Sequence, residues 1–159
     1  MKGLVRWFPH FILGLIACCC IVFAGCEYEA PITEQPTRAV EEKLLGNWSA
    51  ENGTERLKIR EFDASTYVVS YNGHLYRAFH SDFADMPFVS VQNIDSERRT
   101  YAFLTYRLED KSNTLALRSV NIKMVPKDVK DSLQIQALLK KKLKNPALLN
   151  KEIQFVKEQ

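Results

Sequence analysis

The chain has 159 residues, of which 22 are lysine or arginine and 19 are aspartate or glutamate, so its formal net charge is +3. All four cysteines fall within the first 26 residues, which leaves the rest of the chain no disulfide, thiolate nucleophile or cysteine-based zinc site. Residues 26–159 carry 20 basic and 19 acidic side chains, because only Lys2 and Arg6 precede them. This near-neutral balance disfavours nucleic acid as a partner, and the length suits one ordinary domain.

Residues 1–25 have the order of an export signal. Lys2 and Arg6 provide positive charge, residues 11–23 form an uncharged apolar run, and Ala24 and Gly25 are small. The tetrapeptide Phe-Ala-Gly-Cys at 23–26 resembles the bacterial lipobox. This resemblance implies a lipoprotein signal peptide over 1–25 and acyl chains on the sulfur and amine of Cys26. The alternative is an uncleaved transmembrane anchor over residues 8–25, which is just long enough to span a bilayer.

Residues 26–43 are predicted to form the acylated N-terminus and a flexible tether. They contain two prolines, several acids and no sustained apolar period, although residues 39–45 have the potential for a short helical turn. In enteric bacteria an aspartate directly after the acylated cysteine resembles an inner-membrane retention signal. This chain has Glu27 at that position, and the absence of the aspartate favours the outer membrane. We therefore expect a protein of the bacterial cell envelope, attached by lipid to the outer membrane and facing the periplasm.

From residue 44 to residue 159 a single folded domain is expected, because short alternating segments are separated by turn residues. Asn52-Gly53 and Asn72-Gly73 each favour a two-residue hairpin turn, since both central residues of a type I′ turn need positive φ. Strands are predicted over 47–50, 57–60, 67–71, 75–79, 88–91, 101–106 and 115–120. Residues 153–156 are either a last strand or an extended tail. The predicted fold class is mainly β, an antiparallel meander of seven to eight strands curled into a small barrel.

The predicted strand 101–106 has apolar residues on both faces, so it is either central or covered from outside the sheet. A candidate cover is one C-terminal helix over about 127–144, with Val129, Leu133 and Leu143 at helical spacing and Asn145-Pro146 at its end. Aspartates near its start and lysines near its end suit the helix dipole. The lysine run allows a basic patch for anionic lipid or nucleic acid, but a solvated last turn is the expectation.

The residues with catalytic potential do not form a recognisable site. His74 and His80 share one face of a predicted strand but are six residues apart, so a metal site is not expected. His80, Ser81 and Asp82 are the residue types of a hydrolase triad, yet adjacent strand residues point to opposite faces. No phosphate-binding loop or nucleophile elbow occurs in the sequence. We therefore expect neither enzymatic activity nor a cofactor.

Leu45-Gly46-Asn47-Trp48, at the start of the first strand, resembles the Gly-x-Trp opening of lipocalin-like barrels. The resemblance covers residues 44–125 in outline, with Gly46 and Trp48 matching by residue, and the chain looks most like small lipocalin-like bacterial lipoproteins. It implies that Trp48 plugs one end of the barrel under an arginine from a late strand. Arg118 is the matching position, with Arg107 as the alternative.

Two kinds of function remain open at this point. The first is binding of an apolar small molecule in a barrel cavity lined by residues such as Tyr67, Tyr71, Phe79 and Phe103. The second is a solid-core interaction or envelope-assembly module that acts on another envelope protein through a strand edge or the helix face.

Overall fold

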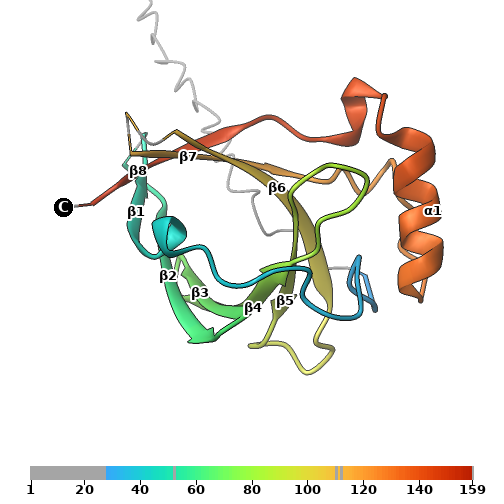
Figure 1. Cartoon of the computed structure of the whole chain (residues 1–159), viewed down its shortest axis with the longest axis horizontal. Helices are drawn as coiled ribbons and strands as arrows, with labels where there is room; N and C mark the ends of the chain where they lie inside the picture. Colours follow the sequence, from blue (N-terminus) through green and yellow to red (C-terminus); the bar gives the residue numbers. More distant parts are fainter. Residues whose placement is uncertain (1–27, 52, 110, 112, 159) are drawn as a thin grey trace, which may run out of the picture.

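The computed structural model describes residues 28–158 apart from 52, 110 and 112. The predicted signal peptide and Cys26 therefore lie outside the described residues. Eight antiparallel strands close into a barrel in sequence order, with β8 paired back to β1 (Figure 1). The strands are β1 Gly46–Ala50, β2 Arg56–Asp63, β3 Thr66–Tyr71, β4 His74–His80, β5 Phe88–Asn93, β6 Tyr101–Glu109, β7 Thr114–Ser119 and β8 Ile153–Lys157. The predicted fold class is confirmed.

The last strand is what closes the barrel. Phe155 of β8 lies opposite Ala50 of β1 on one side and opposite Leu115 of β7 on the other. Of the two possibilities for residues 153–156, the strand is therefore correct. Closure pairs the backbone groups that β1 and β7 would otherwise leave as open edges.

Turn chemistry fixes the register of the central hairpin. Asn72 and Gly73 have φ values of 48° and 88°, and the flanking residues Tyr71 and His74 are paired. Both turn residues thus adopt the positive φ that a type I′ turn requires, as predicted. At the other Asn-Gly pair, Gly53 has φ 71°, while Asn52 lies outside the described residues.

Two apolar cores lie on opposite sides of the sheet. The first fills the barrel and includes Tyr67, Val69 and Tyr71, which share the inner face of β3 as the alternation of strand side chains predicts. The second lies outside the barrel against β5 and β6, where Phe88 and Phe103 are fully buried. Strand β6 therefore contributes to both cores, which explains its apolar residues on both faces.

Helix α1, Ser132–Lys142, covers the outer core and is shorter than the predicted range of about 127–144. The carboxylate of Asp131 accepts a hydrogen bond from the backbone N–H of Gln134 and caps the helix, whose first residue, Ser132, lies five residues after the predicted start at about 127. Ile135 and Leu139 are the fully buried side chains, whereas Leu133 is 76 % exposed. The predicted apolar stripe through Leu133 is therefore wrong. Ile135 and Leu139 are four residues apart and share the buried face, whereas Leu133 precedes Ile135 by two residues and so lies on the opposite side of the helix.

The structure corrects the predicted flexible tether for residues 28–43, since residues 26 and 27 lie outside the described residues. Residues 28–45, here called the strap, lie against the outside of the barrel and end in a 3₁₀ turn, η1 Glu42–Leu44. The backbone of Tyr28 pairs with that of Tyr101, and Ile32 is fully buried. The N–H of Thr37 donates to the carbonyl of His80 at 2.9 Å. Its prolines and acids resemble those of a linker. Its apolar residues fill separate sites on the barrel and do not form one regular face, so they have no periodic spacing that would predict burial.

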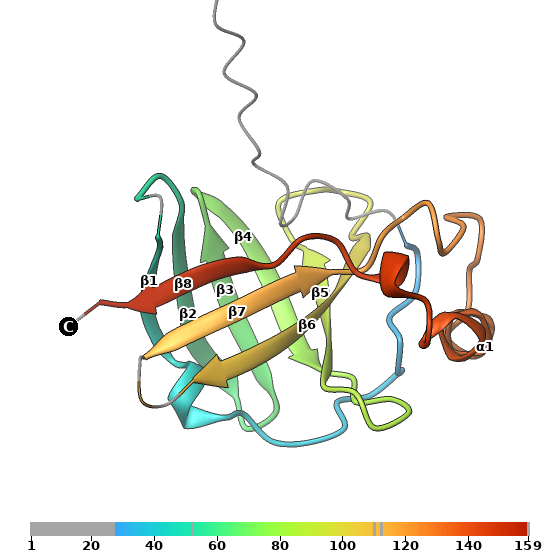
Figure 2. The same cartoon turned by 90° about the horizontal axis from the view of Figure 1, so that it is seen from above.

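The strap runs from one end of the barrel to the other (Figure 2). It starts beside Tyr101, the first residue of β6, and finishes immediately before Gly46, the first residue of β1. In an up-and-down barrel β1 and β6 begin at opposite ends. The end that η1 covers is called the mouth below.

Candidate functional site

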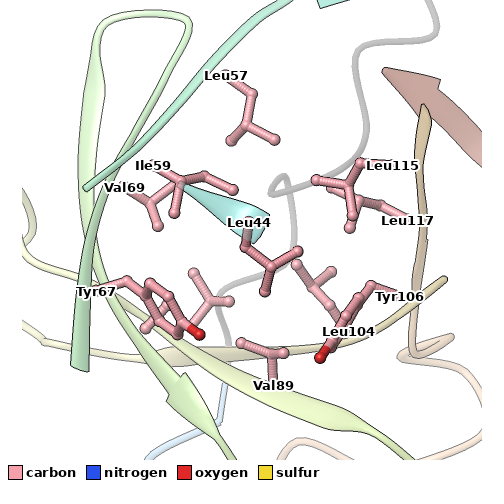
Figure 3. A pocket seen from close by; sticks show the side chains of 12 residues that line it. Leu44, Leu57, Ile59, Tyr67, Val69, Val89, Leu104, Tyr106, Leu115 and Leu117 are labelled. Atoms are coloured by element: carbon pink, nitrogen blue, oxygen red, sulfur yellow. The ribbon is translucent and has the colours of Figure 1, made fainter. Parts of the chain in front are cut away.

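An unfilled space of about 60 Å³ lies inside the barrel, and apolar atoms form its surface (Figure 3). Its lining comes from strands β2 to β7 and from η1. Leu44 of η1 lies at the centre of the ring of labelled side chains in Figure 3 and is 6 % exposed. The lining residues are Leu44, Leu57, Ile59, Tyr67, Val69, Ala78, Val89, Val91, Leu104, Tyr106, Leu115 and Leu117.

Among the four predicted lining residues, Tyr67 lines the cavity. Tyr71 belongs to the inner core, but its hydroxyl donates to Oε1 of Glu55 at 2.7 Å, near the end remote from η1. Phe79 and Phe103 are outside the barrel, so their assignment to the cavity is wrong.

The pairing of the strands explains the error. Phe79 and Phe103 both lie opposite Ser90, whose hydroxyl oxygen accepts a hydrogen bond from the N–H of Ile32 in the strap. Phe103 also stacks on Tyr28 with the ring centroids 4.4 Å apart. The alternation of side chains along a strand correctly predicts which residues share a face. It does not show which face points into the barrel, because both faces of these strands carry apolar residues.

Trp48 is buried near the mouth. Its indole N–H donates to the carbonyl of Leu44 at 3.0 Å, which ties the first strand to η1. The cation over the indole ring is Lys157 of β8, whose Nζ lies 5.2 Å from the ring centroid. Gly46 has φ 145°, and a Cβ there would lie 2.7 Å from Cε of Lys157. The positive φ favours glycine at this position, and the flexible end of Lys157 would have to move to admit a Cβ.

The predicted arginine does not take that place. Arg118 lies at the other end of β7, where its guanidinium donates to the carbonyls of Leu149 and Asn150. Arg107 forms ion pairs with Glu109 and Glu152. Lys157 takes the position over Trp48 because β8, and not β7, pairs with β1.

A polar cluster fastens the strap across the mouth. Arg38 donates from Nε to Oδ2 of Asp82 at 2.8 Å and forms an ion pair with Glu41 at 3.2 Å. The hydroxyl of Tyr106, a cavity-lining residue, donates to Oε2 of Glu41 at 2.7 Å. Burial raises the pKa of Tyr106, as does its hydrogen bond to the Glu41 carboxylate. Tyr106 therefore stays protonated and able to donate.

His80 lies at the inner side of this cluster and is fully buried. The hydroxyl of Tyr67 accepts the N–H of Glu41 at 2.7 Å and lies 2.6 Å from Nε2 of His80. Because that hydroxyl has one proton, the arrangement that satisfies most groups donates it to Nε2 and leaves the imidazole proton on Nδ1. Burial, followed by the charge of Arg38, lowers the pKa of His80 to about 4, so the ring is neutral near pH 7.

The neighbouring residues of His80 do not complete a hydrolase triad. Ser81 lies outside the barrel, where its hydroxyl contacts those of Thr33 and Ser90 at 2.9 and 2.8 Å. His80 instead faces Tyr67, as the alternation along the strand predicts. Within the described part of the chain, no three histidine, cysteine, aspartate or glutamate side chains form a group suited to a metal ion.

Sequence reasoning missed the strap residues Arg38, Glu41 and Leu44, which close the mouth. The spacing of Arg38 and Glu41 by three residues is the only local signal, and it is common in sequences without such a role. None of the described helices is long and apolar enough to cross a membrane. No protein-family model, curated protein or solved structure matches this chain.

Proposed function

We propose that this chain is a non-enzymatic envelope protein, anchored by acyl chains on Cys26, whose barrel binds one small apolar molecule. The observation that carries the binding proposal is the unfilled apolar space inside a closed barrel, with Leu44 reaching in from outside the wall. The lipobox-like tetrapeptide that ends at Cys26 supports the anchor. The lipocalin-like arrangement of strands and the buried Trp48 agree with a binding barrel.

The size of the cavity limits the ligand. A volume of about 60 Å³ is well below the roughly 150 Å³ of a protein cavity that holds benzene. A larger apolar ligand therefore needs Leu44 to leave the barrel. Leu44 belongs to η1, so its departure breaks no pairing between strands. Exposing a buried leucine costs about 1.5–3 kcal/mol, and the ligand must compensate by burying its own apolar surface.

Leu44 thus acts as a lid on the barrel. The strap holds the lid through the ion pairs of Arg38 and through a hydrogen bond from the N–H of Val40 to the carbonyl of Ala64 at 3.0 Å. These contacts lie at the mouth, and opening them also separates Glu41 from the hydroxyls of the lining residues Tyr67 and Tyr106. Binding of a ligand is therefore coupled to release of the end of the strap.

The small volume also favours a second candidate, an interaction module with an essentially filled core. Each described strand is paired on both sides, so a free strand edge is not available for this role. The helix face remains, and the exposed Leu133 lies on it. A barrel that never contains a ligand would support this alternative.

The decisive experiment is native mass spectrometry of the acylated protein purified from its host and washed free of bulk lipid. We expect one apolar molecule per protein chain. Ala78→Leu, which adds carbon atoms directly into the cavity, should remove that molecule without loss of the β-sheet circular dichroism signal. Leu75→Ala, on the partly exposed outer side of the same strand, is the matched control and should retain it. A wild-type protein that is repeatedly empty overturns ligand binding.

A further inference from the structure

The position where the described chain begins constrains how an anchored barrel can sit on a membrane. The side chain of Tyr28 is 1 % exposed, and its hydroxyl donates to the carbonyl of Val125 at 2.9 Å. Its backbone exchanges two hydrogen bonds with Tyr101, at 2.7 and 3.1 Å. Cys26 precedes it by two residues, which span at most about 7 Å. An acyl anchor on Cys26 would therefore hold the membrane close to Tyr28.

Helix α1 lies beside the same part of the strap. The hydroxyl of Ser132 donates to the carbonyl of Pro31 at 2.7 Å, and the side chain of Gln136 donates to the carbonyl of Ile32 at 2.7 Å. Just before the helix, Lys130 forms an ion pair with Glu29 at 3.6 Å. In Figure 1 the helix lies at one side of the molecule, while β1 and η1 lie toward the other.

The helix region carries the positive charge that the rest of the domain lacks. Residues 127–144 contain six lysines and two aspartates, a net charge of +4, whereas residues 26–159 together carry only +1. Lys140, Lys141 and Lys144 are exposed, and so are Leu133 and Ala137. Ile135 and Leu139 point into the outer core, so the lysines and Leu133 occupy the remaining surface of the helix.

We propose that the exposed face of α1 lies on an anionic lipid bilayer, with the mouth of the barrel directed away from it. This inference rests on the proposed acylation of Cys26 and adds an orientation to it. Lysines close to an anionic surface each favour contact by about fivefold at low salt, and Leu133 can enter the interfacial layer. The lysine run is then a lipid-facing surface, which revises the expectation of a merely solvated turn.

The orientation has a consequence for the ligand. The strap spans the barrel from Tyr28 to η1, so the lid residue Leu44 lies at the end remote from the anchor. Exchange of the ligand then takes place with the aqueous side, or with a protein located there, and not directly with the bilayer that carries the anchor.

The test uses the acylated protein after signal cleavage, residues 26–159, in vesicles of phosphatidylcholine, with and without phosphatidylglycerol. The variants are Leu133→Cys and, as the matched position on the barrel, Phe62→Cys; the two native side chains are 76 % and 70 % exposed. Each is labelled with a fluorophore, and quenching by lipids that carry a spin label is measured. We expect the label at 133 to be quenched several times more strongly than the label at 62 in the anionic vesicles.

Charge variants separate lipid attraction from simple proximity. Lys140→Glu with Lys141→Glu should bring the quenching at position 133 down toward that at 62, whereas Lys58→Glu with Lys111→Glu, exposed lysines elsewhere on the domain, should leave it unchanged. Equal quenching at both positions, or quenching independent of phosphatidylglycerol, overturns the proposed surface. The anchor is tested separately, because cleavage before Cys26 removes Cys18, Cys19 and Cys20, and acylation of Cys26 then leaves the wild-type protein without a thiol for maleimide. Wild-type protein that reacts with maleimide and does not float with vesicles overturns the anchor and the orientation together.

Discussion

Leu44→Ala tests the lid most directly. The substitution removes three carbon atoms from a side chain that is 6 % exposed and lines the cavity. At about 0.8 kcal/mol per buried methylene, the lost transfer free energy alone is about 2.4 kcal/mol. The new space adds to that cost because it joins the existing cavity of about 60 Å³. We therefore expect the free energy of unfolding to fall by about 2.5–4 kcal/mol.

The same variant should gain a binding property. Joining the space left by Leu44 to the existing cavity makes room for a small apolar probe such as benzene, which the wild-type cavity is too small to hold. A probe that binds only the folded state at 100 times its Kd raises the free energy of unfolding by about 2.7 kcal/mol. Benzene should therefore restore much of the stability lost in Leu44→Ala and stabilise the wild type much less, because Leu44 must first leave the wild-type barrel.

The assay is urea unfolding followed by circular dichroism, with and without benzene. Leu75→Ala is the matched control, since this leucine is 43 % exposed on the outer face of β4 and lines no cavity. It should lose less than about 1 kcal/mol and gain nothing from benzene. Equal losses for the two variants, or no effect of benzene on Leu44→Ala, would refute the view that Leu44 fills the barrel from the mouth.

Three further substitutions or conditions follow from single sites. Between pH 6.5 and about 4, His80 binds more protons in the unfolded chain than in the folded one. The free energy of unfolding should therefore fall as the pH is lowered, by up to roughly 3 kcal/mol. Urea titrations should show that His80→Phe loses this dependence and that His74→Phe keeps it. Gly46→Ala should destabilise by about 1–3 kcal/mol in thermal melts, and Lys157→Ala in the same chain should recover part of it, because the new Cβ meets that lysine. Asp131→Ala removes the N-cap of α1 and should lower the free energy of unfolding by about 1 kcal/mol. Amide hydrogen exchange should become faster in the first turn of the helix and not elsewhere.

The strands were predictable from sequence because their signals are local. Asn72-Gly73 specifies its hairpin by turn chemistry, and Tyr67, Val69 and Tyr71 mark one face by alternation. The turn residues and the alternation each involve neighbours in sequence, so they can be recognised without knowing how the rest of the chain folds. The apolar residues on both faces of β6 likewise predicted an outer cover, and α1 supplies it.

The mouth shows the limit of such signals. Arg38 approaches Asp82, and Glu41 approaches Tyr106, across 44 and 65 positions of sequence. No periodicity links these residues, and the strap that carries two of them resembles a linker by composition. The cluster exists because the strap crosses the barrel, which is a property of the assembled fold.

The sequence by itself determined the class of fold, the order of the strands, one tight turn and the presence of a C-terminal helix, because these depend on neighbours within a few residues. Only the tertiary structure decided that Phe79 and Phe103 face outward, that Lys157 and not Arg118 covers Trp48, and that residues 28–45 bind the barrel. Alternation divides a strand into two faces without naming the inner one. That choice depends on how β8 closes the barrel and on what packs outside it.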